Sequence, residues 1–153
     1  MLVLFLGLLT LLVTACGSTP AAIGDRVAIH YQGTLDDGSV FDSSLERTPL
    51  EFVIGSGELL QGFEEAVQGL VVDGSALVRI PPAEAYGQID ANAPQPVDLS
   101  LLPPEIAVGD QMDLGTGNIA RVVSIEGDRA MVVINHVLAG QALTFWITLI
   151  EIK

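Results

Sequence analysis

Apolar and polar residues alternate along several short segments of the chain, which is the period-two pattern of a half-buried β-strand. In residues 26–35 the apolar positions are Val27, Ile29 and Tyr31. Residues 75–80 form another such run, which ends at two prolines because proline cannot continue a central ladder. The other segments with strand character are residues 50–54, 119–125, 130–135 and 143–152.

One segment, residues 58–70, has the periodicity of an α-helix instead. Its apolar residues at i, i+4 and i+8 share one face: Leu59, Phe63 and Val67. Ser56 or Gly57 is expected to cap its start. Gly62 lies inside the segment, where glycine costs about 1 kcal/mol relative to alanine, so we expect the backbone to pack closely against a sheet there.

Strands on both sides of a single helix predict an α+β fold, in which the helix covers one face of an antiparallel sheet. The composition changes from residue 88 onward, where prolines punctuate a loop-rich stretch: Pro94, Pro96, Pro103 and Pro104. Within this stretch the sequence Glu126-Gly127-Asp128-Arg129 separates two strand-like runs and is a hairpin signal. We therefore expect an insert before the final strand at residues 143–152.

The N-terminus begins with an almost unbroken apolar run from Leu2 to Val13. It falls short of the roughly 20 apolar residues that a spanning helix needs and fits the apolar part of a secretory signal, with a buried apolar helix as the alternative. Residues 12–16 resemble a bacterial lipobox, which predicts cleavage of a signal peptide at residues 1–15 and lipidation of Cys16. Residues 16–23 then form an uncharged tether, and we expect a lipid-anchored protein of the bacterial cell envelope.

Cys16 is the only cysteine, so an intramolecular disulfide is excluded. The net charge of −13 argues against a nucleic-acid partner, which requires basic patches, and against electrostatic docking on anionic lipid. We interpret the acidic balance as a source of solubility and expect a monomer.

Several motifs in sequence order resemble those of FKBP-type peptidyl-prolyl cis–trans isomerases. They are His30 to Gly38, Val40 to Ser44, Gly57 to Ala66, Ala85-Tyr86-Gly87 and Leu143-Thr144-Phe145. The resemblance implies an antiparallel half-barrel sheet wrapped on one helix, formed by residues 24–87 and 136–153. Residues 135–143 are similar to SlyD-like members of the family, which implies that residues 88–135 form an insert-in-flap domain with chaperone activity.

The resemblance also implies a set of site residues. An isomerase pocket would be lined by Tyr31, Phe41, Leu50, Leu59, Leu60, Phe63 and Phe145. Two candidate catalytic residues border it: Asp42 orients groups at the rim and pairs with Arg47, and Tyr86 donates a hydrogen bond to the substrate carbonyl. Spacing alone favours a plain hydrophobic core for the same aromatic residues.

Prolyl isomerisation breaks no covalent bond, so the resemblance implies no cofactor and no metal. His30 and His136 are the only histidines, and no cysteine other than Cys16 is available for a soft-metal site. The histidine-rich tail for which SlyD is known is not found here, and we do not expect nickel handling. Trp146 alternates with Phe145 and should face away from the pocket.

Two functions of different classes follow. The first is an isomerase acting on X-Pro bonds of exported, unfolded or partly folded polypeptides. The alternative is a holdase chaperone, or a peptide-binding envelope lipoprotein with little isomerase activity, since a fold does not fix a function.

Overall fold

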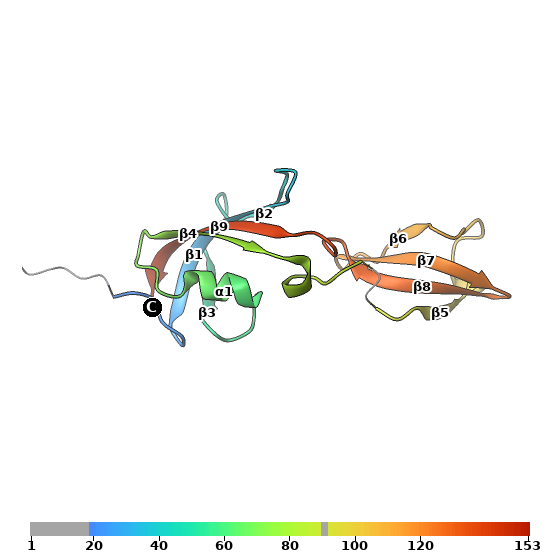
Figure 1. Cartoon of the computed structure of the whole chain (residues 1–153), viewed down its shortest axis with the longest axis horizontal. Helices are drawn as coiled ribbons and strands as arrows, with labels where there is room; N and C mark the ends of the chain where they lie inside the picture. Colours follow the sequence, from blue (N-terminus) through green and yellow to red (C-terminus); the bar gives the residue numbers. More distant parts are fainter. Residues whose placement is uncertain (1–18, 90–91) are drawn as a thin grey trace, which may run out of the picture.

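A computed structural model describes residues 19–89 and 92–153. Two antiparallel sheets lie end to end and give the molecule an elongated shape (Figure 1). Two parts of the chain connect the sheets: residues 81–89 and 92–94 lie between β4 and β5, and residues 137–142 lead back into the first sheet.

The first sheet has five strands in the order β2-β1-β9-β4, and β3 pairs with β1 beside this path. Its strands are β1 Arg26–Thr34, β2 Val40–Ser43, β3 Leu50–Val53, β4 Ser75–Ile80 and β9 Leu143–Ile152. The central pair β1 and β9 runs from Val27 opposite Ile152 to Thr34 opposite Thr144. The strands expected at residues 26–35, 50–54, 75–80 and 143–152 are thereby confirmed, and the first and last strands of the described residues pair in one sheet.

The helix is shorter than expected. α1 spans Gln61–Val67, not residues 58–70, and its N-cap residue is Leu60, which makes no side-chain capping hydrogen bond. Neither Ser56 nor Gly57 is the cap, because the backbone N–H groups of the preceding loop donate to the side chain of Glu64 on the helix. This bonding keeps the loop outside the helix.

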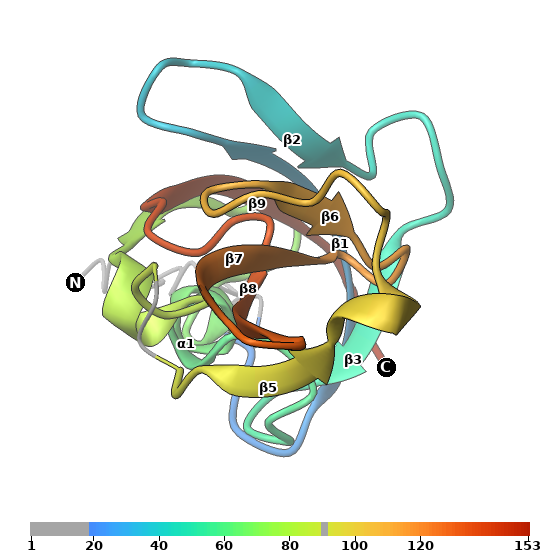
Figure 2. The same ribbon diagram turned by 90° about the vertical axis from the view of Figure 1, so that its right-hand side faces the viewer.

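α1 packs on one face of the first sheet, and β2 projects on the other side when the molecule is viewed from the end of the second sheet (Figure 2). A Cβ atom added at Gly62 would lie 3.3 Å from Ile80 on β4, so the close packing expected at this glycine is present. The core buried between helix and sheet consists mainly of Val27, Ile29, Phe52, Ile54, Phe63, Val67, Ile80, Leu143, Phe145, Ile147 and Leu149. An α+β fold with one helix on an antiparallel sheet is confirmed.

The second sheet has four strands in the order β5-β8-β7-β6. Its strands are β5 Gln95–Asp98, β6 Gln111–Asp113, β7 Asn118–Glu126 and β8 Arg129–His136. The hairpin expected at residues 126–129 joins β7 to β8. The two edge strands were not predicted; β5 contains Pro96, which an edge position tolerates because one side of the strand makes no ladder.

The predicted signal peptide and Cys16 lie outside the described residues. Within residues 19–89 and 92–153, no helix is long and apolar enough to cross a membrane. The same residues contain no group of three or more side chains placed to hold a metal ion.

Candidate active site

A cavity of about 430 Å³ opens where α1 meets the strands of the first sheet. It is lined by Tyr31, Phe41, Asp42, Leu50, Glu58, Leu59, Leu60, Phe63, Tyr86 and Phe145. Every residue that the resemblance implied for the pocket or its border therefore lines this one cavity. The roles of these residues in binding and catalysis stay predictions. Glu58 is the one lining residue that the sequence did not single out, because an exposed glutamate in a loop carries no pattern.

Four rings form the aromatic floor of the cavity. Phe145 on β9 is the centre, with its ring centroid 4.9 Å from that of Phe63 and 5.6 Å from that of Phe41, at interplanar angles of 90° and 84°. Tyr31 on β1 packs edge-on against Phe63 at 5.7 Å. Edge-to-face packing places the positive edge of one ring on the negative face of the next, so the rings hold one another in fixed positions.

Gly33 on β1 gives the ring of Phe41 its place in the cavity. A Cβ atom at this position would lie 2.5 Å from the tip of the Phe41 ring, closer than any real contact. Because Gly33 has no side chain, Phe41 on β2 folds back over β1 and reaches Phe145.

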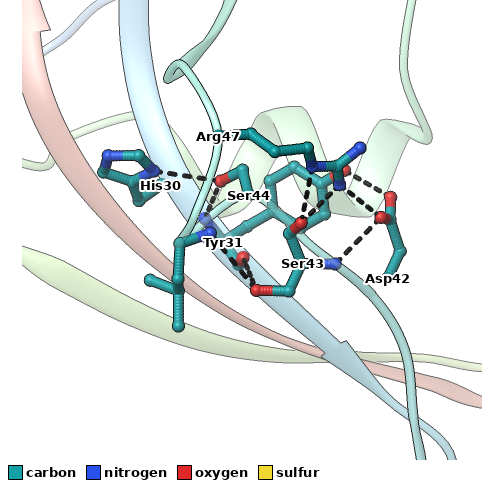
Figure 3. A network of polar contacts seen from close by, with 7 residues as sticks. His30, Tyr31, Asp42, Ser43, Ser44 and Arg47 are labelled. Carbon is teal, nitrogen blue, oxygen red and sulfur yellow. Dashed lines mark hydrogen bonds and ion pairs between the residues drawn. The ribbon is translucent and has the colours of Figure 1, made fainter.

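Asp42 is the centre of the polar rim, which Figure 3 shows from close by. One oxygen, Oδ2, accepts a short hydrogen bond from the hydroxyl of Tyr31. The other, Oδ1, accepts from the backbone N–H of Ser43 at 2.8 Å and pairs with Nη2 of Arg47 at 2.5 Å. The ion pair between Asp42 and Arg47 was expected, whereas the bond to Tyr31 was not, because it depends on the register between β1 and β2.

Ser44 attaches this rim to β1 (Figure 3). Its hydroxyl accepts from the backbone N–H of Tyr31 at 2.9 Å and lies 3.2 Å from Nδ1 of His30. Its own N–H donates to the carbonyl of Tyr31 at 3.0 Å. Ser44 is buried, and its bonds hold the segment after β2 against the strand that carries the pocket tyrosine.

These contacts fix the protonation states at the rim. Burial and the hydrogen bond to Asp42 raise the pKa of Tyr31 to about 12. Burial by itself disfavours the charged form of Asp42, but hydrogen bonds from Tyr31, Arg47 and Ser43 outweigh it and hold the pKa of this carboxyl below its usual value of 3.8. Tyr31 is therefore neutral and Asp42 charged across the range around neutral pH.

The loop that supplies Leu59 and Glu58 to the cavity is held by the buried carboxylate of Glu64 on α1. Its Oε2 accepts from the backbone N–H of Gly55 at 2.8 Å and of Gly57 at 3.3 Å, and its Oε1 accepts from Leu59 at 3.0 Å. A buried carboxylate is tolerated when several N–H groups satisfy it. Sequence reasoning missed this role, since a glutamate in the first turn of a helix is ordinarily solvated.

Tyr86 follows the short 3-10 helix η1 Pro82–Glu84 and lines the cavity. Its ring stacks on that of His136 at the end of β8, with centroids 3.7 Å apart and planes inclined by 8°. Nδ1 of His136 accepts from the backbone N–H of Leu138 at 3.1 Å, and burial holds the pKa of this histidine below its usual 6.5. The stack joins the pocket to the second sheet, and no pattern of residues along the chain predicts it.

Comparison with known proteins shows which family this chain resembles. The model of the FKBP-type peptidyl-prolyl cis-trans isomerases matches residues 17–149. The chain is 41% identical over 80 residues to FK506-binding protein 2 of Yarrowia lipolytica, covering 52% of this chain and 56% of that protein. It is 33% identical over 131 residues to the FKBP-type peptidyl-prolyl cis-trans isomerase SlyD of Vibrio cholerae, covering 82% of this chain and 65% of that protein.

A third relative matches along nearly its whole length. The short-type peptidyl-prolyl cis-trans isomerase of Methanocaldococcus jannaschii is 31% identical over 150 residues, which cover 85% of this chain and 92% of that protein. The resemblance drawn from the motifs thus extends over both sheets, since the matches to the second and third relatives reach far beyond the residues of the first sheet alone. The chain belongs to the family of FKBP-type peptidyl-prolyl cis-trans isomerases.

Proposed function

We propose that this chain is a peptidyl-prolyl cis–trans isomerase and that the cavity at α1 is its active site. The observation that carries the proposal is the aromatic floor formed by Tyr31, Phe41, Phe63 and Phe145 under a charged rim. An apolar cleft of about 430 Å³ accepts a proline ring and its neighbours. Family membership adds independent support.

The reaction requires the cavity to lower a rotational barrier of roughly 18–20 kcal/mol, which is the resonance energy lost when the C–N bond twists. The twisted amide is less polar than the planar one, so a dry aromatic site favours it over the ground state. Only such differential binding accelerates the reaction, because a site that bound both states equally would change affinity alone. The interlocked rings supply a surface that keeps its shape during the twist.

The polar residues position groups without transferring protons. Asp42 fixes the hydroxyl of Tyr31 and the guanidinium of Arg47, and the shifts in pKa keep Asp42 charged and Tyr31 neutral near pH 7. Tyr86 borders the same cavity. The family resemblance implies that its hydroxyl donates a hydrogen bond to the substrate carbonyl. We therefore expect turnover to be nearly independent of pH between about 6 and 9, unlike that of an acid–base catalyst.

The test is a protease-coupled assay of a proline tetrapeptide with the full chain. We expect acceleration over the uncatalysed exchange, which takes tens to hundreds of seconds. Tyr86→Phe and Asp42→Leu should lower turnover while the circular dichroism spectrum is retained. Trp146→Phe, on the outer face of β9, is the matched control and should leave turnover unchanged. A folded chain that does not accelerate the exchange overturns the proposal.

A second candidate function is a holdase that binds unfolded chains through the second sheet, as an insert-in-flap domain would. It is favoured by apolar side chains that this region exposes: Leu101 at 78%, Val108 at 60% and Leu114 at 44%. Contiguous exposed apolar surface is typical of binding sites for other chains. The triple variant with serine at these positions should lose suppression of aggregation and keep tetrapeptide turnover.

Leu77→Ser is the control for this second function, since Leu77 is 65% exposed but lies on β4 of the first sheet. If the triple variant and the control suppress aggregation equally well, the holdase function is wrong. If the unaltered chain shows neither isomerase nor holdase activity, a peptide-binding role remains. Binding of the tetrapeptide would test that role.

We also propose that the substrates are exported polypeptides, because Cys16 would anchor the chain to a membrane of the cell envelope. The support is the lipobox-like sequence Leu12-Val13-Thr14-Ala15-Cys16 after an apolar run. A chain that carries several acyl groups on one cysteine remains stably anchored. Mass spectrometry of the mature N-terminus tests this: an acylated Cys16 is expected, and an uncleaved N-terminus contradicts it.

A further inference from the structure

A second cavity lies at the junction of the two sheets, next to the proposed active site. Its volume is about 640 Å³, and its lining includes Tyr86, Asn92, Gln95, Asn118 and His136. Gln95 begins β5, Asn118 begins β7 and His136 ends β8, so the cavity is formed where the strands of the second sheet meet the segments that connect the sheets.

The cavity is polar but carries no charged residue among those that line it. Three carboxamides, those of Asn92, Gln95 and Asn118, supply most of its hydrogen-bonding groups. A carboxamide offers two N–H donors and a carbonyl acceptor, which are the same groups that a peptide backbone presents. This lining therefore suits the main chain of an extended polypeptide rather than an anion, a cation or an apolar ligand.

Existing hydrogen bonds hold two of these carboxamides in position. Nδ2 of Asn92 donates to the carbonyl of Ile134 at 2.6 Å, and Nδ2 of Asn118 donates to the hydroxyl of Thr116 at 3.3 Å. Each bond uses one of the two hydrogens of the amide nitrogen, so the second hydrogen of each group is available to a ligand. Groups fixed in advance lose less conformational entropy when they bind.

Tyr86 lines both cavities. Its stacking on His136 fixes the plane of its ring between the apolar site and the amide-lined one. A polypeptide whose proline lies on the aromatic floor therefore passes Tyr86 on its way to the second cavity. An extended chain advances about 3.3–3.6 Å per residue, so a few residues beyond the proline suffice to reach it.

We propose that the cavity at the sheet junction is a second substrate subsite, which binds main-chain amide groups of residues that flank the proline on one side. This inference rests on the proposed isomerase function and specifies its substrates as segments longer than a tetrapeptide. Because the subsite recognises the backbone, it raises affinity for many sequences alike. Its contacts lie away from the twisting bond, so they lower KM and leave kcat nearly unchanged.

The experiment compares kcat/KM for a proline tetrapeptide with that for the same peptide extended by about four residues at either end. We expect one of the two extensions to raise kcat/KM about tenfold, the gain that two or three net hydrogen bonds provide. Gln95→Ala and Asn118→Ala, tested separately, should each remove part of this gain and lower the ratio of extended to short peptide to about three- to fivefold. Gln111→Ala is the matched control, because Gln111 is an exposed carboxamide on β6 outside the cavity and should keep the tenfold ratio.

Two outcomes would separate the subsite from the isomerase function. If the tetrapeptide is turned over but neither extension raises kcat/KM, the subsite is wrong and the active site stands. If no peptide is turned over, the proposed function is wrong, and the subsite is judged by the side-chain NH2 resonances of Gln95 and Asn118. Saturable shifts with the extended peptide, and not with the tetrapeptide, would support it; unchanged resonances would overturn it.

Discussion

The two sheets of this chain bury apolar residues in very different ways. The first sheet packs on α1 around a large core whose aromatic members also form the floor of the cavity. Within residues 19–89 and 92–153, the α-helix α1 packs on the first sheet, and the buried hydrophobic cluster of the second sheet consists of Val122, Ala130 and Val132, with other residues only partly buried around them. A large core holds a catalytic surface in a fixed shape, whereas a small apolar cluster stabilises the strands around it less.

This difference has an energetic consequence. Small apolar clusters stabilise a structural unit less, because the favourable free energy of burial grows with the apolar area removed from water. Proteins also open locally, with the least stabilised segments opening at the lowest free energy. The second sheet should therefore open more readily than the first, and substitutions in the two cores should separate them.

Phe145→Ala should have the largest effect on the first sheet, since three other aromatic rings of the cavity pack against Phe145. Loss of a buried phenylalanine costs about 3–5 kcal/mol in free energy of unfolding, through lost burial and the void it leaves. Urea unfolding followed by fluorescence of Trp146 measures it. Trp146→Ala, monitored by circular dichroism, is the control; Trp146 is 54% exposed, as expected from its alternation with Phe145, and a loss as large as that of Phe145→Ala would contradict this packing.

Val122→Ala should destabilise the second sheet by about 2 kcal/mol and leave the first sheet nearly unaffected. Val122 is fully buried on β7 and belongs to that small core. Amide hydrogen exchange should become faster in β7 and β8 while protection in β1 and β9 is retained. If all four strands lose protection together, the two sheets unfold as one unit and the comparison fails.

Asp42→Asn tests how far the charge of Asp42 raises the pKa of Tyr31 at the rim of the cavity. The folded-state pKa of Tyr31 is about 12, above its usual 10.0, so the neutral phenol contributes stability that is present below pH 10 and lost as pH rises through 12. Removing the charge of Asp42 should lower this pKa toward 10.0, with the part caused by burial remaining. Ultraviolet titration in a Tyr86→Phe background observes Tyr31 alone, because the chain has two tyrosines. An unchanged titration would exclude Asp42 as a cause.

His136→Gln should have the smallest effect, and it tests the junction between the sheets. Burial lowers the folded-state pKa of His136, so the stability contributed by its neutral form is present above about pH 6.5 and is lost as pH falls below that value. The carboxyls with lowered pKa values, such as Asp42 and Glu51, lose their contributions only below about pH 4. We expect the free energy of unfolding in urea to fall between pH 7 and pH 5 in the unaltered chain and to fall less in the variant. Equal dependence on pH in the two proteins would contradict the role of burial.

Long periodic segments made much of the first sheet predictable from the sequence. Residues 143–152 alternate over their whole length, and β9 has those same bounds. The helix was predicted too long because Glu64 reads as a solvated helix residue, although it satisfies the N–H groups of the loop before α1. The strands β5 and β6 were missed because they are short edge strands, and β5 contains a proline.

The site was predictable where it depends on residue types in ordered motifs, and not where it depends on spatial pairing. The aromatic lining follows from motifs that resemble the family, and the cavity indeed brings those residues together. The bond between Tyr31 and Asp42 depends on the register of β1 and β2, and the stack of Tyr86 on His136 depends on how the second sheet meets the first. Neither relation leaves a local pattern in the sequence.

Exchange NMR on a short proline peptide tests whether the aromatic cavity of the first sheet isomerises X-Pro bonds. The cis and trans forms give separate resonances, and their uncatalysed exchange takes tens to hundreds of seconds. We predict that a trace of the chain speeds this exchange in proportion to its concentration, and that Phe145→Ala abolishes the effect while Trp146→Ala retains it. Peptide resonances that shift on binding while the exchange rate stays at its uncatalysed value would contradict the claim.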